Sequence, residues 1–481
     1  MDDYLFFNLW LFDYLVQQLH LSFKMSFAIA AVLTFLAAAL VYRLIFSVFF
    51  SPLAKIPGPK SFALTKARLA YEDYRGSRTR TINVLHRKYG PAVRIGPNEV
   101  TFNSTPALRA IYGAGSGFER TSFYSMFEAY GRKNMFSFHT VKEHGDRKKM
   151  FAHAYAKSAI LKPDTAAMIE RKVKSYLELL EKDGRTSEIF SSLHYFSLDA
   201  ITDFVYGRFG KTSCLQGAEK DRALIGDIMS TARRKLSWYT VHFPSFTKWL
   251  YSQTGMMGCI ARQFYPMQLP TTYTGIRLYA MKACQEFSKA SPEAKEKETS
   301  VISRLWKHHR SQKENGIDDV DIAAECADHL LAGIDTTSDT LMFLVWSLSR
   351  PEHKEFQQKL IDEVRGISES DLNTDGIPKA EVTDRLSYVD AVIKETLRLY
   401  APLPGTEPRS LPTAATVDGY MIPPRTIVSI SPYALHRNPD VFKDPLKFNP
   451  DRWLDNSQDT AEMKKWFWAF SSGGRMCIGM Q

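Results

Sequence analysis

The chain has 481 residues, of which 44% are hydrophobic and 24% charged; this is the composition of a globular protein and excludes a disordered one. The net charge of +10 comes without a dense basic run, zinc-finger spacing or a single-strand-binding pattern, so nucleic-acid binding is not expected. The positive excess is better suited to an anionic membrane or an acidic protein partner. The five cysteines are few, odd in number and widely spaced, which excludes a disulfide framework and favours a reducing compartment.

Residues 1–50 are predicted to be an N-terminal segment that contains a membrane anchor. Residues 26–41 carry no charge, and the apolar pattern continues to residue 50 with only Arg43 interrupting it. A transmembrane helix at about 26–49 is therefore expected, with residues 1–23 as an interfacial segment before it. Basic residues follow the helix and acidic residues precede it, which places the rest of the chain in the cytosol.

Residues 51–60 contain three prolines and a glycine and are predicted to be a stiff hinge. The remaining residues, 61–481, are expected to form one large domain. Within it, residues 92–95 and 99–102 are strand-like and flank Gly-Pro-Asn, which predicts a β-hairpin.

One long helix is predicted at about 319–350, because acidic residues suit its start and Pro351 ends it. Its middle reads Ala332-Gly-Ile-Asp-Thr-Thr337, and four of these residues are poor choices for a helix interior. A functional reason is therefore expected. Small residues would admit a flat cofactor, and side chains that bond back to the helix would widen a turn.

A further helix is predicted to open at Ser387, with Ser387 and Asp390 as a capping box, and to end before Pro402. Glu395 and Arg398 lie three residues apart in it, so they share one face.

The last residues contain an isolated cysteine between glycines: residues 470–479 read Phe-Ser-Ser-Gly-Gly-Arg-Met-Cys-Ile-Gly. A thiolate is a soft metal ligand, but one cysteine without a second Cys or His nearby cannot build a four-ligand zinc site. Cys477 suits the axial position of a planar cofactor that brings its own nitrogens, as haem does. Arg475 can reach an anionic propionate of such a cofactor.

Phe470, Gly473, Arg475, Cys477 and Gly479 match the F-x-x-G-x-R-x-C-x-G signature of the cytochrome P450 superfamily. The chain resembles this family along essentially its whole length, from the anchor and proline-rich segment to the cysteine loop. The resemblance implies a mainly α fold with small β-sheets, haem b as the cofactor and Cys477 as the ligand of its iron.

The resemblance also implies roles for residues upstream. Asp335 would relay protons and Thr336 would donate the hydrogen bond that steers O–O cleavage. Arg452, in a run that resembles the family's P-x-R motif, would join Glu395 and Arg398 in a structural network that fixes the cysteine loop.

Contacts to the haem propionates are expected from Arg409 and from the segment that begins at His144. Many relatives carry W-x-x-x-R or H-x-x-x-R there, so His144 matches the first position and Lys148 the last. Arg147 is the competitor; Lys148 is favoured because residues i and i+4 share a helix face.

The function implied is a haem-dependent monooxygenase that inserts one oxygen atom from O2 into a small lipophilic substrate. Electrons would come from NADPH through an NADPH-cytochrome reductase, with a b-type cytochrome as a second possible partner. The sequence looks most like fungal members that tailor terpenoids or polyketides, anchored by one helix in the endoplasmic reticulum membrane with the domain in the cytosol.

Two alternatives remain open. In relatives a helix and a strand pair follow the cysteine loop, and these are expected to be missing here, which would make the chain a truncated, inactive member. The other alternative is a non-oxygenating haem-thiolate isomerase or dehydratase, against which the intact Asp335–Thr336 pair argues.

Overall fold

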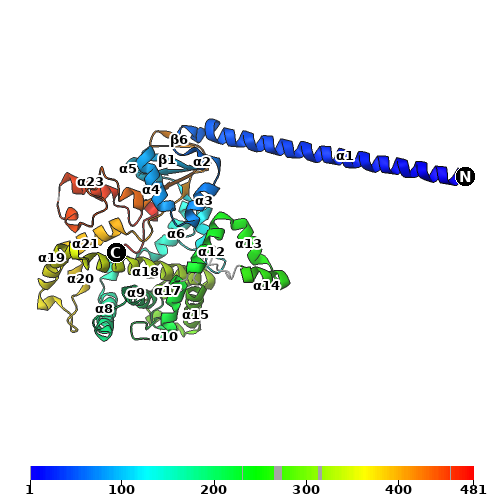
Figure 1. Cartoon of the computed structure of the whole chain (residues 1–481). Helices are drawn as coiled ribbons and strands as arrows, with labels where there is room; N and C mark the ends of the chain where they lie inside the picture. Colours follow the sequence, from blue (N-terminus) through cyan, green and yellow to red (C-terminus); the bar gives the residue numbers. More distant parts are fainter. Residues whose placement is uncertain (1, 230, 265–273, 312–316, 456, 481) are drawn as a thin grey trace.

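The computed structural model describes residues 2–229, 231–264, 274–311, 317–455 and 457–480. It is mostly helical with small sheets, as predicted. Figure 1 shows a long single helix, α1 (Asp2–Ile45), projecting from a body in which strands gather near the base of that helix and helices fill the rest.

The predicted membrane anchor is one continuous helix. The stretch Lys24–Phe50 has a mean hydropathy of 2.3, and its most apolar 18-residue window has no buried residue. Among the described residues it is the one helix long and apolar enough to cross a bilayer. This matches the predicted span at 26–49. Residues 2–23, predicted as a separate interfacial segment, instead continue the same helix, and a π-helical turn (Phe46–Phe50) ends it.

The proline-rich segment after the anchor packs on the body. It contains a short 3₁₀ turn (Pro52–Lys55), and Leu53 and Ile56 are buried against the sheet. Arg94 donates to the Ser47 carbonyl at 2.8 Å and to the Pro97 carbonyl at 2.7 Å, so it ties the end of the anchor to the body. The Arg94 backbone N–H also donates to the Pro57 carbonyl at 2.7 Å, so Arg94 holds both the end of the anchor and the predicted hinge on β1.

The main sheet has the strand order β1-β2-β7-β4-β3. The predicted hairpin is confirmed as β1 (Ala92–Gly96) and β2 (Glu99–Phe102), which pair antiparallel. β7 (Ile427–Ile430) runs parallel to β2, and β4 (Arg409–Ser410) joins β7 to β3 (Glu119–Arg120). A separate pair is formed by β5 (Ala415–Val417) and β6 (Tyr420–Ile422).

The centre of the helical body is α18 (Asp319–Leu348), which confirms the long helix predicted at 319–350. Asp318 caps its first turn in a capping box with Asp321. α9 (Ile189–Tyr206), α15 (Thr274–Lys289) and α17 (Val301–Ser311) pack against it around the largest buried cluster. α18 is α-helical throughout, so the widened turn expected at its motif is not present.

The other helices surround this centre and the sheet. The longer ones are α3 (Ala67–Tyr74), α4 (Arg78–Tyr89), α5 (Thr105–Tyr112), α6 (Val141–Ala152), α8 (Pro163–Asp183), α12 (Thr231–His242), α13 (Pro244–Ser252), α14 (Gly255–Phe264), α19 (Lys354–Arg365), α21 (Ser387–Leu399) and α23 (Gln458–Trp466). The shorter ones are α2 (Lys60–Leu64), α7 (Lys157–Ile160), α10 (Glu219–Arg222), α11 (Gly226–Met229), α16 (Pro292–Lys297), α20 (Ala380–Thr383) and α22 (Pro432–Leu435).

Candidate active site

The cysteine loop is folded around its own backbone hydrogen bonds. The Cys477 N–H donates to the Phe470 carbonyl at 2.8 Å, and the Met476 N–H donates to the Gly473 carbonyl at 3.1 Å. The side chain of Cys477 is open on one side. The surrounding protein raises the pKa of this thiol, while the Gly479 N–H and the charge of Lys148 act to lower it.

Two contacts fix the start of the loop on the body. Gly473 has a φ of 63°, and a Cβ there would collide with the Tyr112 carbonyl, so only glycine fits. The Trp468 N–H donates to Nε2 of His436 at 2.8 Å, and the other ring nitrogen lies 3.1 Å from the Arg398 carbonyl. One imidazole thus bridges the end of α21 and the approach to the loop.

The predicted Glu395–Arg398–Arg452 network is present. Arg398 donates to both Glu395 oxygens at 2.8 Å through Nε and Nη2, and Arg452 Nε donates to the same carboxylate at 3.1 Å. The Asn449 N–H and the Trp453 indole N–H complete its partners, at 2.9 and 3.0 Å. Glu395 and Arg398 are fully buried, so five donors satisfy one buried carboxylate.

The capping box predicted at the start of this helix is wrong. Ser387 is the first helical residue, and its side chain caps nothing. The Tyr388 and Val389 N–H groups instead donate to the Glu363 carboxylate of α19, at 2.8 and 2.9 Å. Asp390 pairs with Lys394 on the surface. A carboxylate from another helix therefore supplies the negative charge that this N-terminus favours.

Positively charged side chains gather beside the cysteine loop. Arg475 donates to the carbonyls of residues 138, 139 and 140, and Arg409 contacts Tyr124 and Glu407 at 2.7 and 3.2 Å. Burial, together with the charges of Arg120 and Arg409, lowers the pKa of Arg475 to about 9. Burial and the same cations lower the pKa of the buried His144 to about 3, so its ring is neutral.

Arg120 belongs to this cluster although no sequence motif marks it. It comes from the two-residue strand β3, and its guanidinium lies over the rings of Tyr124 and Phe136 at 4.5 and 4.4 Å. The Nε atoms of Arg120 and Arg475 are buried without a hydrogen-bond partner among the described residues. Crowded cations with spare donors suit an anionic group, so the site fits the two propionates of a haem.

The two competing residues of α6 point to different places. Arg147 is buried and forms an ion pair of 2.6 Å with Glu325 of α18. Lys148 Nζ donates to the Gly474 carbonyl at 3.2 Å and to the Met476 carbonyl at 2.7 Å. Lys148 is therefore the residue of the two that reaches the cysteine loop.

Some residues of the motif in α18 pack against a neighbouring helix, and others are exposed. A Cβ on Gly333 would lie 2.5 Å from Ile201 of α9, so this glycine permits close helix packing and not the approach of a cofactor. Ala332 is exposed and is the small residue on the open side. Thr336 Oγ1 donates to the Ala332 carbonyl at 2.7 Å, and Asp335 beside it is half-buried.

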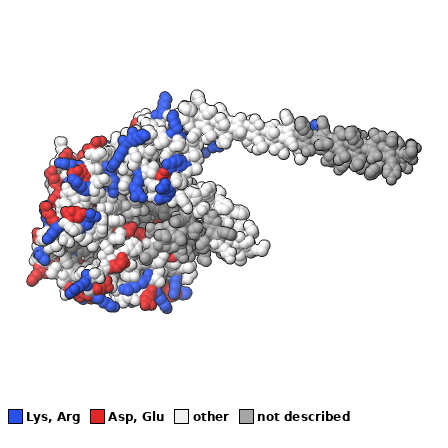
Figure 2. Space-filling view, viewed as in Figure 1, with Lys and Arg blue, Asp and Glu red and all other residues white. Residues whose placement is uncertain are grey.

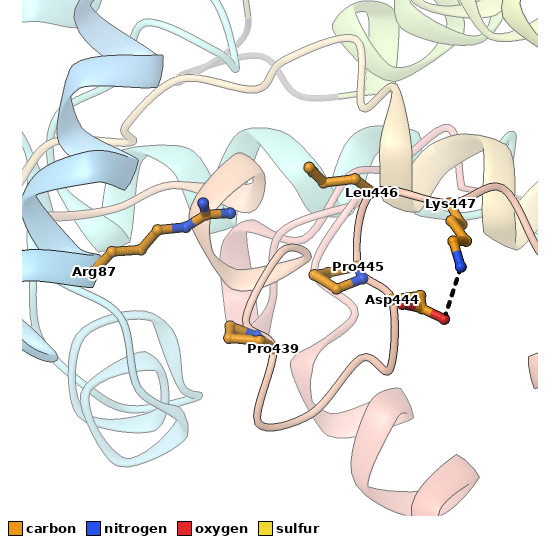
Figure 3. Close-up of a pocket in the computed structure, with 6 residues that line it drawn as sticks. All are labelled: Arg87, Pro439, Asp444, Pro445, Leu446 and Lys447. Carbon is orange, nitrogen blue, oxygen red and sulfur yellow. Dashed lines mark hydrogen bonds and ion pairs between the residues drawn. The ribbon is translucent and has the colours of Figure 1, made fainter.

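A surface pocket of about 410 Å³ lies between α4 and the loop before Arg452, and Arg398 donates to the carbonyls of two of its wall residues, Pro445 and Lys447, at 2.7 and 3.1 Å. Figure 3 shows Arg87 extending from α4 toward the prolines of that loop, with Asp444 paired to Lys447 at 3.2 Å. None of the predicted site residues lines it; its walls are Arg87, Pro439, Asp444, Pro445, Leu446 and Lys447.

Comparisons with known proteins agree with this geometry. The family model described as Cytochrome P450 matches residues 56–481. The chain is 30% identical to Cytochrome P450 monooxygenase aflV of Aspergillus parasiticus, over 92% of this chain and 83% of that protein. It is also 30% identical to Cytochrome P450 monooxygenase stcB of Emericella nidulans, over 90% and 79% of the two chains. BipB of Cochliobolus sativus is 29% identical over 91% and 84%. The protein belongs to the cytochrome P450 family and is related to its fungal monooxygenases.

Proposed function

We propose that this protein is a membrane-anchored haem-thiolate monooxygenase that inserts one oxygen atom from O2 into a small lipophilic molecule, of the terpenoid or polyketide class. The observation that carries the proposal is a single thiol, Cys477, held open in a fixed loop beside a cluster of cations. That combination provides one soft axial ligand and countercharges for an anionic planar cofactor.

The chain's own residues divide the work of holding haem b. Cys477 would bind the iron, with the Gly479 N–H near the sulfur, and Phe470 and Gly473 would hold the loop in shape. Arg120, Arg409 and Arg475 would pair with the propionates, next to the neutral ring of His144. Haem with a thiolate ligand supplies oxygen activation when bound.

Asp335 and Thr336 would handle protons on the open side of α18. The Thr336 hydroxyl donates a hydrogen bond to the Ala332 carbonyl at 2.7 Å, and rotation of the hydroxyl would redirect this donor toward the cofactor. The half-buried Asp335 carboxyl, next to it in the helix, can pass protons from solvent.

The surface supports attachment to a membrane. On the described part of α13 and α14, which project from the body in Figure 1, Figure 2 shows mainly uncharged side chains. Exposed apolar side chains there add a second lipid-facing surface to α1: Phe243, Phe246, Trp249, Met256, Met257 and Ile260. We place the anchor in the endoplasmic reticulum membrane with the domain in the cytosol.

Electrons would come from NADPH through an NADPH-cytochrome reductase, with a b-type cytochrome as a second donor. Lys142 of α6 exposes 89% of its side chain and is close in sequence to the residues that contact the cysteine loop. This cation suits an acidic face on the electron donor.

The test is the absorption spectrum of the reduced, carbon-monoxide-bound protein, expressed as the full 481-residue chain with haem supplied. A Soret band at the thiolate position is expected. Cys477→Ala should abolish this band, whereas Cys259→Ala, a matched change at another exposed cysteine, should leave it unchanged. Absence of haem, a band at the neutral-thiol or histidine position, or a thiolate band that survives Cys477→Ala would refute the proposal.

A further inference from the structure

We propose that Lys148 is a positioning residue for the iron ligand: its ammonium group ties two carbonyls of the cysteine loop to α6 and so sets where Cys477 stands. The inference rests on the proposed function, because it takes Cys477 to be the ligand. It differs from the role that the sequence pattern implied for Lys148, which was contact with a haem propionate.

The geometry places the ammonium immediately before the ligand. Met476, whose carbonyl accepts from Lys148 Nζ at 2.7 Å, is the residue that precedes Cys477. Gly474, whose carbonyl accepts at 3.2 Å, stands two residues earlier. Because the Met476 carbonyl belongs to the peptide group that leads into Cys477, holding it restricts the rotation of that peptide. Charge-assisted hydrogen bonds of this kind are stronger than neutral ones.

The contact is reciprocal. Arg475, between the two carbonyls that Lys148 holds, donates to the carbonyls of Phe138, His139 and Thr140 at 2.7–2.9 Å. Thr140 is the N-cap of α6, the helix that carries Lys148. A cation from the loop thus binds the entrance of the helix, and a cation from the helix binds the loop. The two segments are thereby locked in one relative position.

No carboxylate of the described residues neutralises the charge of Lys148, so this charge can act on the Cys477 sulfur. Within the described ranges, Lys148 makes no ion pair with a carboxylate, whereas its neighbours Arg147 and Lys149 pair with Glu325 and Asp146. Burial lowers the pKa of Lys148, and the nearby Cys477 acts to raise it. The propionates are then served by Arg120, Arg409 and Arg475, which leaves Lys148 free for the loop.

The experiment compares Lys148→Met and Lys148→Arg with Lys149→Met, which removes the same charge one residue along the same helix. Lys149 exposes 81% of its side chain and pairs with Asp146 at 3.4 Å, so it is a matched control. Each full-length protein is loaded with haem. The readout is the rate at which the thiolate Soret band of the reduced carbon-monoxide complex converts to the neutral-thiol band in mild denaturant.

Lys148→Met is expected to speed this conversion at least about tenfold, which corresponds to about 1.4 kcal/mol. Lys148→Arg should restore much of the loss because it keeps a cation with several donors, and Lys149→Met should match the wild type. If Lys148→Met does not fold, Lys148→Gln takes its place with the same expected direction. Equal rates for the wild type and a folded Lys148 variant, or an equal change in Lys149→Met, would overturn the inference.

A second measurement separates the two roles of Lys148. Haem transfer to excess apomyoglobin reports how firmly the propionates are held. Faster haem loss with an unchanged thiolate fraction would assign Lys148 to a propionate and overturn the positioning role. A wild-type protein without any thiolate band would refute the proposed function itself. A thiolate band whose conversion rate is the same in the Lys148 variants would refute only the positioning role.

Discussion

Arg147 of α6 donates to Glu325 of α18 across 2.6 Å, and both side chains are almost closed to solvent. The same Glu325 carboxyl accepts the Met135 N–H at 3.0 Å. One acidic side chain of α18 therefore joins this helix to α6 and to the segment before α6.

Loss of the cation from this pair should destabilise the fold. At a pH above about 8, where Glu325 is charged in the wild type, Arg147→Met is expected to lower the free energy of unfolding by about 3–5 kcal/mol, because the buried carboxylate must then stay unpaired or take up a proton. Urea denaturation measures the change. The double variant Arg147→Met, Glu325→Leu should recover most of it, and a double variant as unstable as the single one would contradict this explanation.

The same carboxyl gives stability a pH dependence. Burial raises the pKa of Glu325 to about 8 against the opposing charge of Arg147, from a value of 4.5 in an unfolded chain. The folded state holds the proton more tightly, so its contribution is fully present below about pH 4.5 and is lost as the pH rises through about 8. The wild type should lose stability relative to Glu325→Gln over that interval, as measured by denaturation at a series of pH values. Parallel curves would argue against the raised pKa.

The buried network around Glu395 should be among the least tolerant positions. Glu395→Ala leaves five donors without an acceptor, so we expect a loss of about 3–5 kcal/mol or failure to fold. The control is Asp390→Asn in the same helix, where the exposed pair with Lys394 should matter by less than about 0.5 kcal/mol. Thermal unfolding of the two variants makes the comparison. Similar losses in both would show that burial of the network is not the cause.

Gly333 should resist even the smallest substitution. Gly333→Ala brings a methyl group to 2.5 Å from Ile201, and overpacking of this kind costs about 1–3 kcal/mol. Adding Ile201→Ala should relieve the clash. Gly145→Ala is the control, since nothing lies within 4 Å of a Cβ at that helical position. The measurement is the free energy of unfolding of the wild type, Gly333→Ala, the double variant and Gly145→Ala. A Gly333→Ala variant as stable as the wild type would exclude the close packing.

Features that depend on local pattern were predictable from the sequence. The limits of α18 follow from acids at its start and Pro351 at its end, and the hairpin of β1 and β2 follows from its central turn. The Glu395 network was accessible because Glu395 and Arg398 share a helix face and because the run around Arg452 resembles the family's P-x-R motif. In each case the residues that determine the feature are close in sequence or belong to a motif.

Features set by tertiary contact were not predictable. Glu363 caps α21 from another helix, so the local Ser387 signal was misleading. Arg120 joins the cation cluster because β3 pairs with β4, which carries Arg409, and neighbouring residues give no sign of this. The carbonyls that Lys148 binds are more than 300 residues away. Helix periodicity could select the face of Lys148 but not its partner.

In the proposed membrane-anchored protein, the buried guanidinium of Arg94 would connect the anchor mechanically to the sheet beside the cysteine loop. Arg94 lies in β1 and holds the last turn of the anchor, while Arg409 and Arg120 lie in β4 and β3 of the same sheet. A tilt imposed on α1 by the surrounding lipid is therefore resisted by hydrogen-bonded strands and is not absorbed by a loose linker. If α1 spans a bilayer as proposed, a mismatch between its length and the bilayer thickness would act on the sheet that carries Arg409 and Arg120.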